Sequence, residues 1–220
     1  MIIASISYKG GVGKSTVAQN LAVCFAHNKY KVCIIDADET QASVRWTGVR
    51  YENEIKPAIQ AIGLTDPQAF IGAVKRQYED YDIVIIDCPP SLSKIASKAM
   101  LISHLMVVPL TPTGGSDIWV TEDFLERYNE IQDQQEERKP AYLLVNRFEP
   151  NINLHKAYLG VLDNIKDDFK VGIMETKLHK RTAYGEANAR GKAVYEYDNP
   201  KAKKEIKELA KEILDIMDNE

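Results

Sequence analysis

Residues 9–16 read Lys9-Gly10-Gly11-Val12-Gly13-Lys14-Ser15-Thr16, and no other stretch of the chain says as much about its fold. It lies between an apolar run that predicts a strand, residues 2–7, and a segment of helical period, residues 15–27. Glycines allow backbone conformations in which successive N–H groups turn inward around phosphate oxygens, and the N-terminus of the following helix favours the same anion. The stretch therefore predicts a loop that holds the phosphates of a nucleotide.

Two side chains of this loop have chemistry of their own. The Lys14 ammonium would neutralise the β and γ phosphates, and the Ser15 hydroxyl would ligate magnesium. The general motif has a glycine where this chain has Tyr8, so Lys9 occupies the second position of the loop. A glycine-rich turn with an incidental lysine is the alternative interpretation. The predicted nucleotide-binding residues here are Lys9, Gly10, Gly11, Val12, Gly13, Lys14, Ser15 and Thr16.

Apolar runs of strand length recur along the rest of the chain. They cover residues 31–36, 82–87, 104–110 and 141–146, and segments of helical period cover residues 67–79, 96–102 and 117–135. Continuous rather than alternating apolar strands, joined by helical crossovers, are typical of a parallel sheet buried on both faces. We therefore predict an α/β fold with a doubly wound, mainly parallel sheet and helices on both faces, as a single domain over residues 1–220.

Two of the predicted strands end in aspartate, at the edge where an open parallel sheet faces its ligand crevice. One strand ends at Asp36 and is followed by Ala37 and Asp38, and another ends at Asp87. Asp87 would hold magnesium through water, because Mg²⁺ gives up its hydration reluctantly. Loop solvation or helix capping is the alternative role for Asp38.

The stretch K-G-G-V-G-K-S resembles the deviant Walker A motif of the ParA/MinD family of ATPases, and the similarity extends along essentially the whole chain. Lys9 stands where that family carries its signature lysine, which reaches across a dimer to the nucleotide of the other subunit. A solvated loop charge is the other interpretation of Lys9. The resemblance implies a ParA-type partition ATPase that binds ATP with Mg²⁺, in a short form without an N-terminal DNA-reading domain.

The resemblance also implies roles for the aspartates. Asp38 would orient or activate the attacking water, and Asp36 would lie closer to the magnesium shell. Many relatives continue with proline and glutamine, whereas this chain reads Glu39-Thr40-Gln41. The implied catalytic residues are Lys9, Lys14 and Asp38. The implied magnesium ligands are Ser15, Asp36 and Asp87.

Three later segments are similar to parts of ParA-type proteins. Residues 108–112 with Asp117 resemble the segment at the dimer face, and residues 88–91, Cys-Pro-Pro-Ser, resemble the second switch. Asn146 would contact the adenine edge, or it would cap a turn. No N-K-x-D guanine motif follows Asn146, which favours ATP as the nucleotide.

The chain carries a formal net charge of −4, so contact with nucleic acid would need a local basic patch. Residues 177–200 resemble the C-terminal stretch of ParA-type proteins and contain a basic cluster that could hold DNA phosphates without reading bases. A solvated charged surface is the alternative. The predicted DNA-binding residues are Lys177, Lys180, Arg181, Arg190 and Lys192.

The last segment, residues 200–217, predicts an amphipathic helix. Pairs of Lys201 with Glu205 and of Lys204 with Glu208 are expected on its solvent side. Its end reads LDIMDNE, and these acids would be repelled from anionic lipid. We therefore expect the helix to dock on its own domain rather than on a membrane.

Three functional hypotheses follow. The first is a DNA partition ATPase whose ATP-bound sandwich dimer binds nonspecific DNA and is released when a ParB-like centromere-binding or adaptor protein stimulates hydrolysis. The second is a MinD-like or orphan ParA-like ATPase that positions protein cargo. The third is a metabolic ATP-dependent enzyme, against which Lys9 and the lack of a recognisable second-substrate motif argue. Without a signal peptide or metal-spaced cysteines, we expect a cytoplasmic protein, associated with the nucleoid when ATP is bound.

Overall fold

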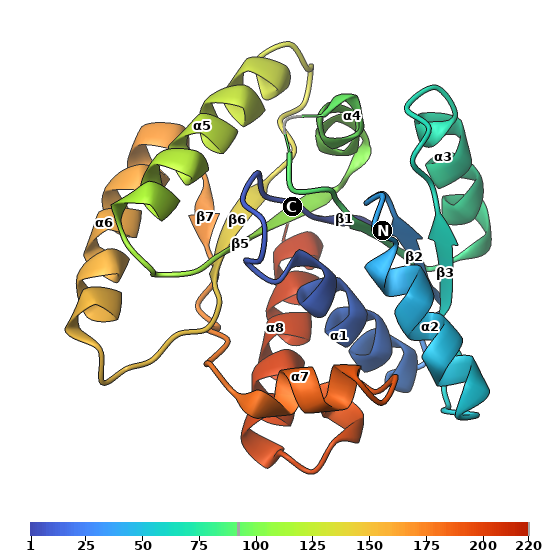
Figure 1. Cartoon of the computed structure of the whole chain (residues 1–220). Coiled ribbons are helices and arrows are strands. Elements are labelled where there is room, and N and C mark those ends of the chain that lie inside the picture. Colours follow the sequence, from blue (N-terminus) through green and yellow to red (C-terminus); the bar gives the residue numbers. More distant parts are fainter. Residues whose placement is uncertain (92, 220) are drawn as a thin grey trace.

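The computed structural model describes residues 1–91 and 93–219, and its strands form one seven-stranded sheet (Figure 1). The strand order is β3-β2-β4-β1-β5-β6-β7, and every neighbouring pair runs parallel. The strands are β1 (Ile2–Ser5), β2 (Val32–Asp36), β3 (Gln60–Gly63), β4 (Ile83–Asp87), β5 (Leu105–Leu110), β6 (Ala141–Val145) and β7 (Gly172–Ile173).

Helices cover both faces of this sheet (Figure 1). On one face lie α1 (Lys14–His27), α2 (Ala42–Glu52), α7 (Thr182–Asn188) and α8 (Pro200–Asp218), with the short 3₁₀ helix η1 (Val194–Glu196). On the other face lie α3 (Phe70–Asp80), α4 (Lys94–Ile102), α5 (Gly115–Gln132) and α6 (Asn153–Phe169).

Burial explains why the sequence selects this architecture. Every residue of β1, β2, β4 and β5 is buried, because helices pack on both sides of these strands. One core cluster joins the sheet to α5 and α6 through Phe124 and Leu162, and a second joins it to α1 and α8 through Leu21 and Ile206. The predicted fold class is confirmed, and the sheet is parallel throughout.

The strand order reverses around β1. The chain passes from β1 through α1 to β2 on one side, whereas β5, β6 and β7 add on the other side. In open α/β sheets, ligands bind outside the carboxyl ends of the strands at such a reversal. The glycine-rich loop that follows β1 lies there, so the topology places it at the ligand crevice.

The segments that form α2, β3, α6, β7 and α7 were not predicted as elements from the sequence. β3 is an edge strand whose residues are exposed or half-buried, so its apolar signal is weak. α2 buries Ser43, Trp46 and Arg50, two of which are polar, and hydrophobic periodicity therefore does not mark it.

The C-terminal helix α8 docks on its own domain, as predicted. Ile206, Leu209 and Ile213 are fully buried against α1 and the sheet. Among the residues that the structure describes, no helix is both long enough and apolar enough to cross a bilayer.

The ion pairs of α8 differ in part from those predicted. Lys204 pairs with Glu208 at 3.5 Å, as expected. The expected pairing of Lys201 with Glu205 is wrong, because Glu205 is buried and accepts a hydrogen bond from Arg181 Nε at 3.0 Å. The helical pattern of the sequence predicts that Glu205 faces solvent. In the structure Glu205 instead turns inward and holds Arg181, which directly precedes α7.

A buried arginine ties α2 to the C-terminal part of the chain. Arg50 is 2% exposed, and its guanidinium donates to both carboxylate oxygens of Glu196, at 2.6 and 2.7 Å. It also donates to the carbonyls of Gly191 and Pro57, at 2.9 and 2.8 Å. Gly191 has a φ of +69°, and a Cβ there would lie 2.7 Å from the backbone nitrogen of Arg50, so the close approach requires glycine.

We predict that Glu196→Gln lowers the free energy of unfolding by about 3 kcal/mol, because the Arg50 guanidinium would stay buried without its counter-charge. Urea denaturation followed by circular dichroism measures this. The control is Glu208→Gln, which removes the exposed pair with Lys204 and should cost less than about 1 kcal/mol. Equal losses in the two variants would contradict a special role for the buried pair.

Candidate nucleotide and magnesium site

The phosphate loop has the backbone that the sequence predicts. Gly11 and Gly13 have φ of +75° and +101°, a region that side chains disfavour. Asn146, at the end of β6, donates from Nδ2 to the carbonyl of Val12 at 2.7 Å. A Cβ on Gly13 would lie 2.2 Å from that Nδ2, so Asn146 closes the loop only over a glycine. The adenine contact predicted for Asn146 stays a prediction.

Lys14 is a buried cation at the first position of α1. It is 7% exposed, and its ammonium donates to the carbonyl of Lys9 at 2.9 Å. Burial lowers the pKa of Lys14, and the nearby Cys88 and Asp87 offset part of that effect. A buried ammonium with few partners is suited to receive an anion, because phosphate oxygens would replace the lost hydration.

The two metal-site carboxylates lie side by side. Asp36 and Asp87 end neighbouring strands in the same register. Burial raises the pKa of Asp87 to about 7, while the Ser43 and Ser15 hydroxyls beside it act in the opposite direction. Burial also raises the pKa of Asp36, and backbone N–H groups at the start of α2 lower it.

These residues fit a magnesium ion. Asp87 Oδ1 is buried and meets no hydrogen-bond partner among the described residues, and the Ser15 hydroxyl lies near Asp87. Mg²⁺ is commonly bound by one or two carboxylates together with waters and substrate phosphates, where it neutralises charge on the phosphates. Asp36 accepts from the backbone N–H of Ser43 and Val44 at 2.8 and 3.0 Å. These bonds place Asp36 to orient α2 beside the site, and its predicted contact with magnesium stays a prediction.

Asp38 lies two residues beyond the end of β2, half-buried. Its Oδ1 accepts from the backbone N–H of Thr40 at 2.8 Å, which fixes the turn into α2. It lines a pocket of 460 Å³ with Pro89 and Pro90 of the predicted second switch. Burial lowers the pKa of Lys14, and the charge of Asp38 acts in a minor way to raise it. The predicted role of Asp38 in positioning the attacking water stays a prediction.

Lys9 forms an ion pair with Asp117 in the first turn of α5. The Asp117 side chain is 1% exposed, and it also accepts from the backbone N–H of Thr113 at 3.0 Å. Lys9 is thus held by its own chain in this structure. To reach a nucleotide on another subunit, its ammonium has to leave Asp117. The sequence singled out both residues but not their pairing.

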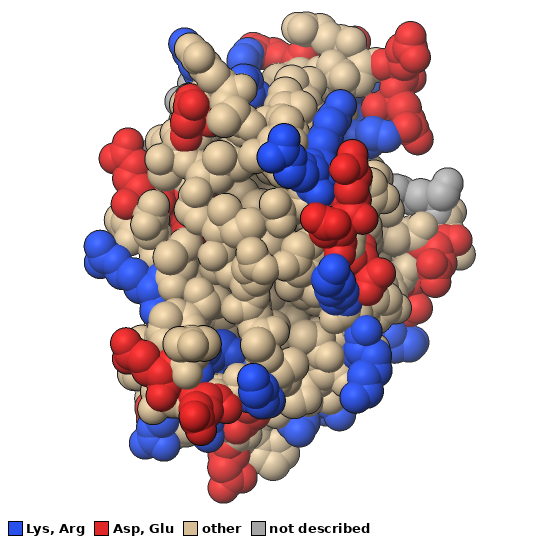
Figure 2. Space-filling model, turned by 90° about the vertical axis from the view of Figure 1, so that its right-hand side faces the viewer, with Lys and Arg blue, Asp and Glu red and all other residues tan. Residues whose placement is uncertain are grey.

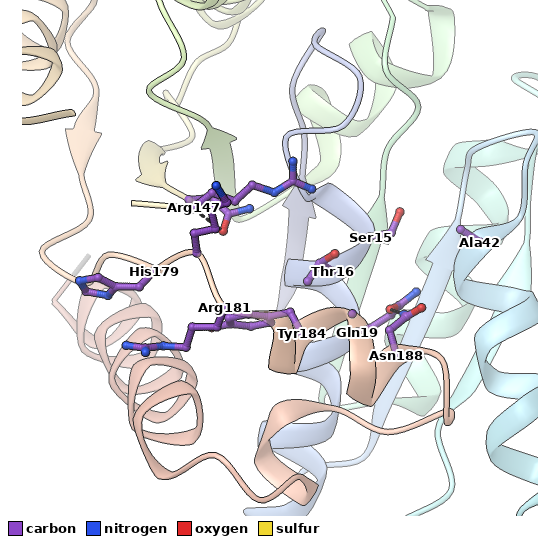
Figure 3. Close-up of a pocket in the computed structure, with 12 residues that line it drawn as sticks. Ser15, Thr16, Gln19, Ala42, Arg147, His179, Arg181, Tyr184 and Asn188 are labelled. Atoms are coloured by element: carbon purple, nitrogen blue, oxygen red, sulfur yellow. Dashed lines mark hydrogen bonds between the residues drawn. The ribbon is translucent and has the colours of Figure 1, made fainter. Parts of the chain in front are cut away.

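A pocket of 390 Å³ adjoins the phosphate loop (Figure 3). This volume lies within the range of small-molecule sites, and α1, α7 and the end of β6 enclose it. Lys180 and Arg181 of the predicted basic cluster line it, whereas Lys177, Arg190 and Lys192 do not. Its lining residues are Ser15, Thr16, Gln19, Ala42, Asn146, Arg147, His179, Lys180, Arg181, Tyr184, Gly185 and Asn188.

Several residues of this pocket were not predicted from the sequence. Figure 3 shows Arg147 on one side, Tyr184 on another, and Gln19 beside Asn188 where α1 meets α7. Gln19 and Asn188 are separated by 169 residues in the chain, and no motif links them. The turn of α1 that contains Gln19 follows the phosphate loop directly, which is the one signal that could have marked it.

Comparison with known proteins agrees with this geometry. A family model, the CobQ/CobB/MinD/ParA nucleotide binding domain, matches residues 3–194. The chain belongs to this family. It is a P-loop ATPase of the ParA/MinD type, a class of enzymes that hydrolyse ATP to ADP and phosphate.

Individual members of the family that resemble the chain have different roles. The chain is 24% identical over 217 residues to the maintenance of carboxysome distribution protein A of Halothiobacillus neapolitanus, covering 96% of this chain and 95% of that protein. A solved structure of a Borrelia burgdorferi protein assigned to plasmid partition, bound to AMPPNP, superposes with a TM-score of 0.74 at 20% identity, covering 98% of each chain. The solved structure of MinD of Pyrococcus horikoshii with Mg-ADP superposes with a TM-score of 0.74 at 21% identity, covering 96% of this chain and 95% of that chain.

We predict that Lys14→Ala abolishes tight nucleotide binding, because the loop would lose its buried cation at the β and γ phosphates. The matched control is Lys9→Ala, which removes the other loop lysine. In this ParA/MinD-type ATPase it should leave ADP binding to the monomer within about threefold of wild type. Isothermal titration calorimetry with ADP measures both variants. Wild-type affinity in Lys14→Ala would remove Lys14 from the phosphate site.

Proposed function

We propose that the chain is an ATP-dependent partition ATPase. It binds ATP with Mg²⁺, forms a two-fold dimer around the nucleotides, and in that state binds nonspecific DNA. A ParB-like centromere-binding or adaptor protein then stimulates hydrolysis and releases the dimer. The proposal concerns a cytoplasmic protein that associates with the nucleoid in its ATP state.

The observation that carries the proposal is Lys9. Its ammonium lies at the rim of a complete phosphate loop, against the first turn of α5 rather than against its own phosphate site. In a dimer, the same cation would stabilise charge that develops on the partner's phosphoryl group.

Trp119 offers a way to observe the dimer. The chain has two tryptophans, of which Trp46 is buried and Trp119 is 67% exposed. Trp119 is an exposed side chain near the start of α5, the helix whose first turn holds Lys9 through Asp117, and we propose that a partner subunit at this end of α5 covers it. ATP should therefore shift the emission of Trp119 to shorter wavelength.

We predict that Asp38→Ala still dimerises with ATP but hydrolyses it about a hundredfold more slowly, because a group that positions water is removed while the phosphate contacts stay. Phosphate release measures hydrolysis, and light scattering with Trp119 emission measures the dimer. Trp119→Phe in the same background should lose the emission shift and keep the dimer. Turnover of Asp38→Ala at the wild-type rate would exclude the proposed role of Asp38.

The distribution of charge limits where DNA can bind. On the side of the molecule that carries α2 and α3, acidic and basic side chains are interspersed beside a broad area that shows neither kind (Figure 2). Among the predicted DNA contacts, Arg181 is held by Glu205 and Lys180 by Glu149, at 3.0 Å in each case. These two cations are partly neutralised, which weakens their contribution to a phosphate-binding surface.

Other cations on the α7–α8 side contact aromatic rings rather than carboxylates. Lys203 and Lys207 lie over the ring of Tyr195, at 4.5 and 5.4 Å from its centroid. Arg190 lies 5.6 Å from the ring centroid of Tyr197. A ring leaves the full charge of a cation available to a phosphate. We therefore include Lys203 and Lys207 in the proposed DNA surface, beside Lys177, Arg190 and Lys192.

We predict that ATP, but not ADP, confers binding to duplex DNA irrespective of its sequence, because a two-fold dimer presents two weak basic patches to one duplex. Lys203→Ala with Lys207→Ala should reduce the slope of log affinity against log salt by about 0.9 for each DNA phosphate that the variant no longer neutralises. Mobility shifts on unrelated duplexes across a salt series measure this. Lys204→Ala, whose cation already pairs with Glu208, is the control on the same helix.

A second candidate function is the positioning of protein cargo. It is favoured by the likeness over 96% of this chain to a protein that maintains carboxysome distribution. That role would share the nucleotide site and differ in the partner that stimulates hydrolysis. If the wild-type protein formed ATP dimers and bound no DNA at low salt, this candidate would replace the first.

A further inference from the structure

A chain of hydrogen bonds runs from the metal-site carboxylate to the wall of the pocket beside the phosphate loop. The Ser43 hydroxyl donates to Asp87 Oδ2 at 2.7 Å. Gln19 Nε2 donates to the Ser43 hydroxyl at 3.2 Å, and Asn188 Nδ2 donates to Gln19 Oε1 at 2.7 Å. The four residues come from β4, α2, α1 and α7, so this hydrogen-bond chain runs from the sheet to α7.

All the donors in this chain point the same way. Each group gives its hydrogen toward Asp87, and each bond therefore polarises the next one toward the negative charge. Ser43 and Gln19 are buried, at 0% and 3% exposure, which leaves little water to replace a broken link. Reversing the Gln19 amide would oppose donor to donor at one end and acceptor to acceptor at the other.

Ser43 also holds the second carboxylate. Its backbone N–H donates to Asp36 Oδ2 at 2.8 Å while its hydroxyl donates to Asp87. One residue at the start of α2 thus fixes the orientation of both carboxylates, and the hydroxyl leaves Asp87 Oδ1 without a partner among the described residues. Hydrogen bonds to the carboxylates of a metal site commonly set its metal affinity.

The other end of the chain faces the pocket. Asn188 and Gln19 both line it, and Figure 3 shows them side by side below Ser15 and Thr16. A base or ribose in this pocket would lie against the side-chain amide of Asn188, which is the first donor of the hydrogen-bond chain. The wall of the pocket and the orientation of Asp87 therefore share one set of hydrogen bonds.

We propose that Ser43 and Gln19 are positioning residues that couple magnesium binding at Asp87 to the pocket wall at Asn188. The inference rests on the proposed function in one respect, namely that a magnesium nucleotide occupies this site. Asn188 does not belong to the metal site, but through these hydrogen bonds it contributes to the affinity for magnesium. A ligand in the pocket and a magnesium ion at Asp87 would change each other's affinity by the same factor.

The test is the magnesium dependence of ADP binding, measured by isothermal titration calorimetry across a magnesium series. The readout is the magnesium concentration at which the gain in ADP affinity is half complete. We expect Ser43→Ala to raise this midpoint about tenfold. Asn188→Ala, at the exposed end of the chain, should raise it roughly twofold to fivefold. In the Asn188→Ala background, Gln19→Ala should raise the magnesium midpoint little further, because the hydrogen-bond chain is already interrupted at Asn188.

Tyr184→Phe is the matched control. Tyr184 lines the same pocket but takes no part in the hydrogen-bond chain, and its hydroxyl donates to Glu205 instead. Its magnesium midpoint should equal that of wild type. An Asn188→Ala variant that changed ADP affinity equally with and without magnesium would overturn the coupling and leave Asn188 as a wall of the pocket. Failure of the wild-type protein to bind ADP at any magnesium concentration would instead overturn the proposed function itself.

Discussion

The left-handed backbone of Gly13, closed by the side chain of Asn146, governs the geometry of the nucleotide site. The loop has to turn its N–H groups inward and still pass directly into α1, and a side chain at residue 13 would collide with the amide that holds it. Because Asn146 directly follows β6, the loop is fixed by a strand on the far side of β5 as well as by β1. The shape of the phosphate site is therefore a property of the whole sheet.

The electrostatics of the site are unfavourable without a ligand. Burial lowers the pKa of Lys14 and raises that of Asp87, so each charged form is disfavoured where it stands. A ligand that brings phosphate to the cation and magnesium to the carboxylate would relieve both. Binding of this kind would stabilise the folded protein.

Ion pairs within the chain control which cations are available to other molecules. Asp117 holds Lys9, and Glu205 holds Arg181, although both the lysine and the arginine stand in stretches that resemble contact surfaces of ParA-type proteins. The carboxylates concerned are buried, so these pairs are screened less by solvent than surface pairs are. A molecule that used either cation would have to displace one of the chain's own acids.

The fold class, the phosphate loop and the two strands that end at Asp36 and Asp87 could all be predicted from the sequence. They follow from local rules, namely glycine spacing between a strand and a helix, and continuous apolar runs buried on both faces. The family could be predicted as well, since Lys9 has a fixed place in one short motif. α2 and β3 were not predicted because neither has a clear hydrophobic periodicity. The buried residues of α2 are mostly polar, and the residues of β3 are exposed or half-buried.

Which side chains meet could be learned only from the folded chain. Asn146 closes a loop 134 residues away, Arg50 reaches Glu196 across 146 residues, and Asn188 reaches Gln19 across 169 residues. Glu205 has the spacing of a solvent-facing acid, yet it is buried against Arg181. Hydrogen bonds and ion pairs act over a few ångströms in space, and separation along the chain does not report that distance until the sheet has set the order of its strands.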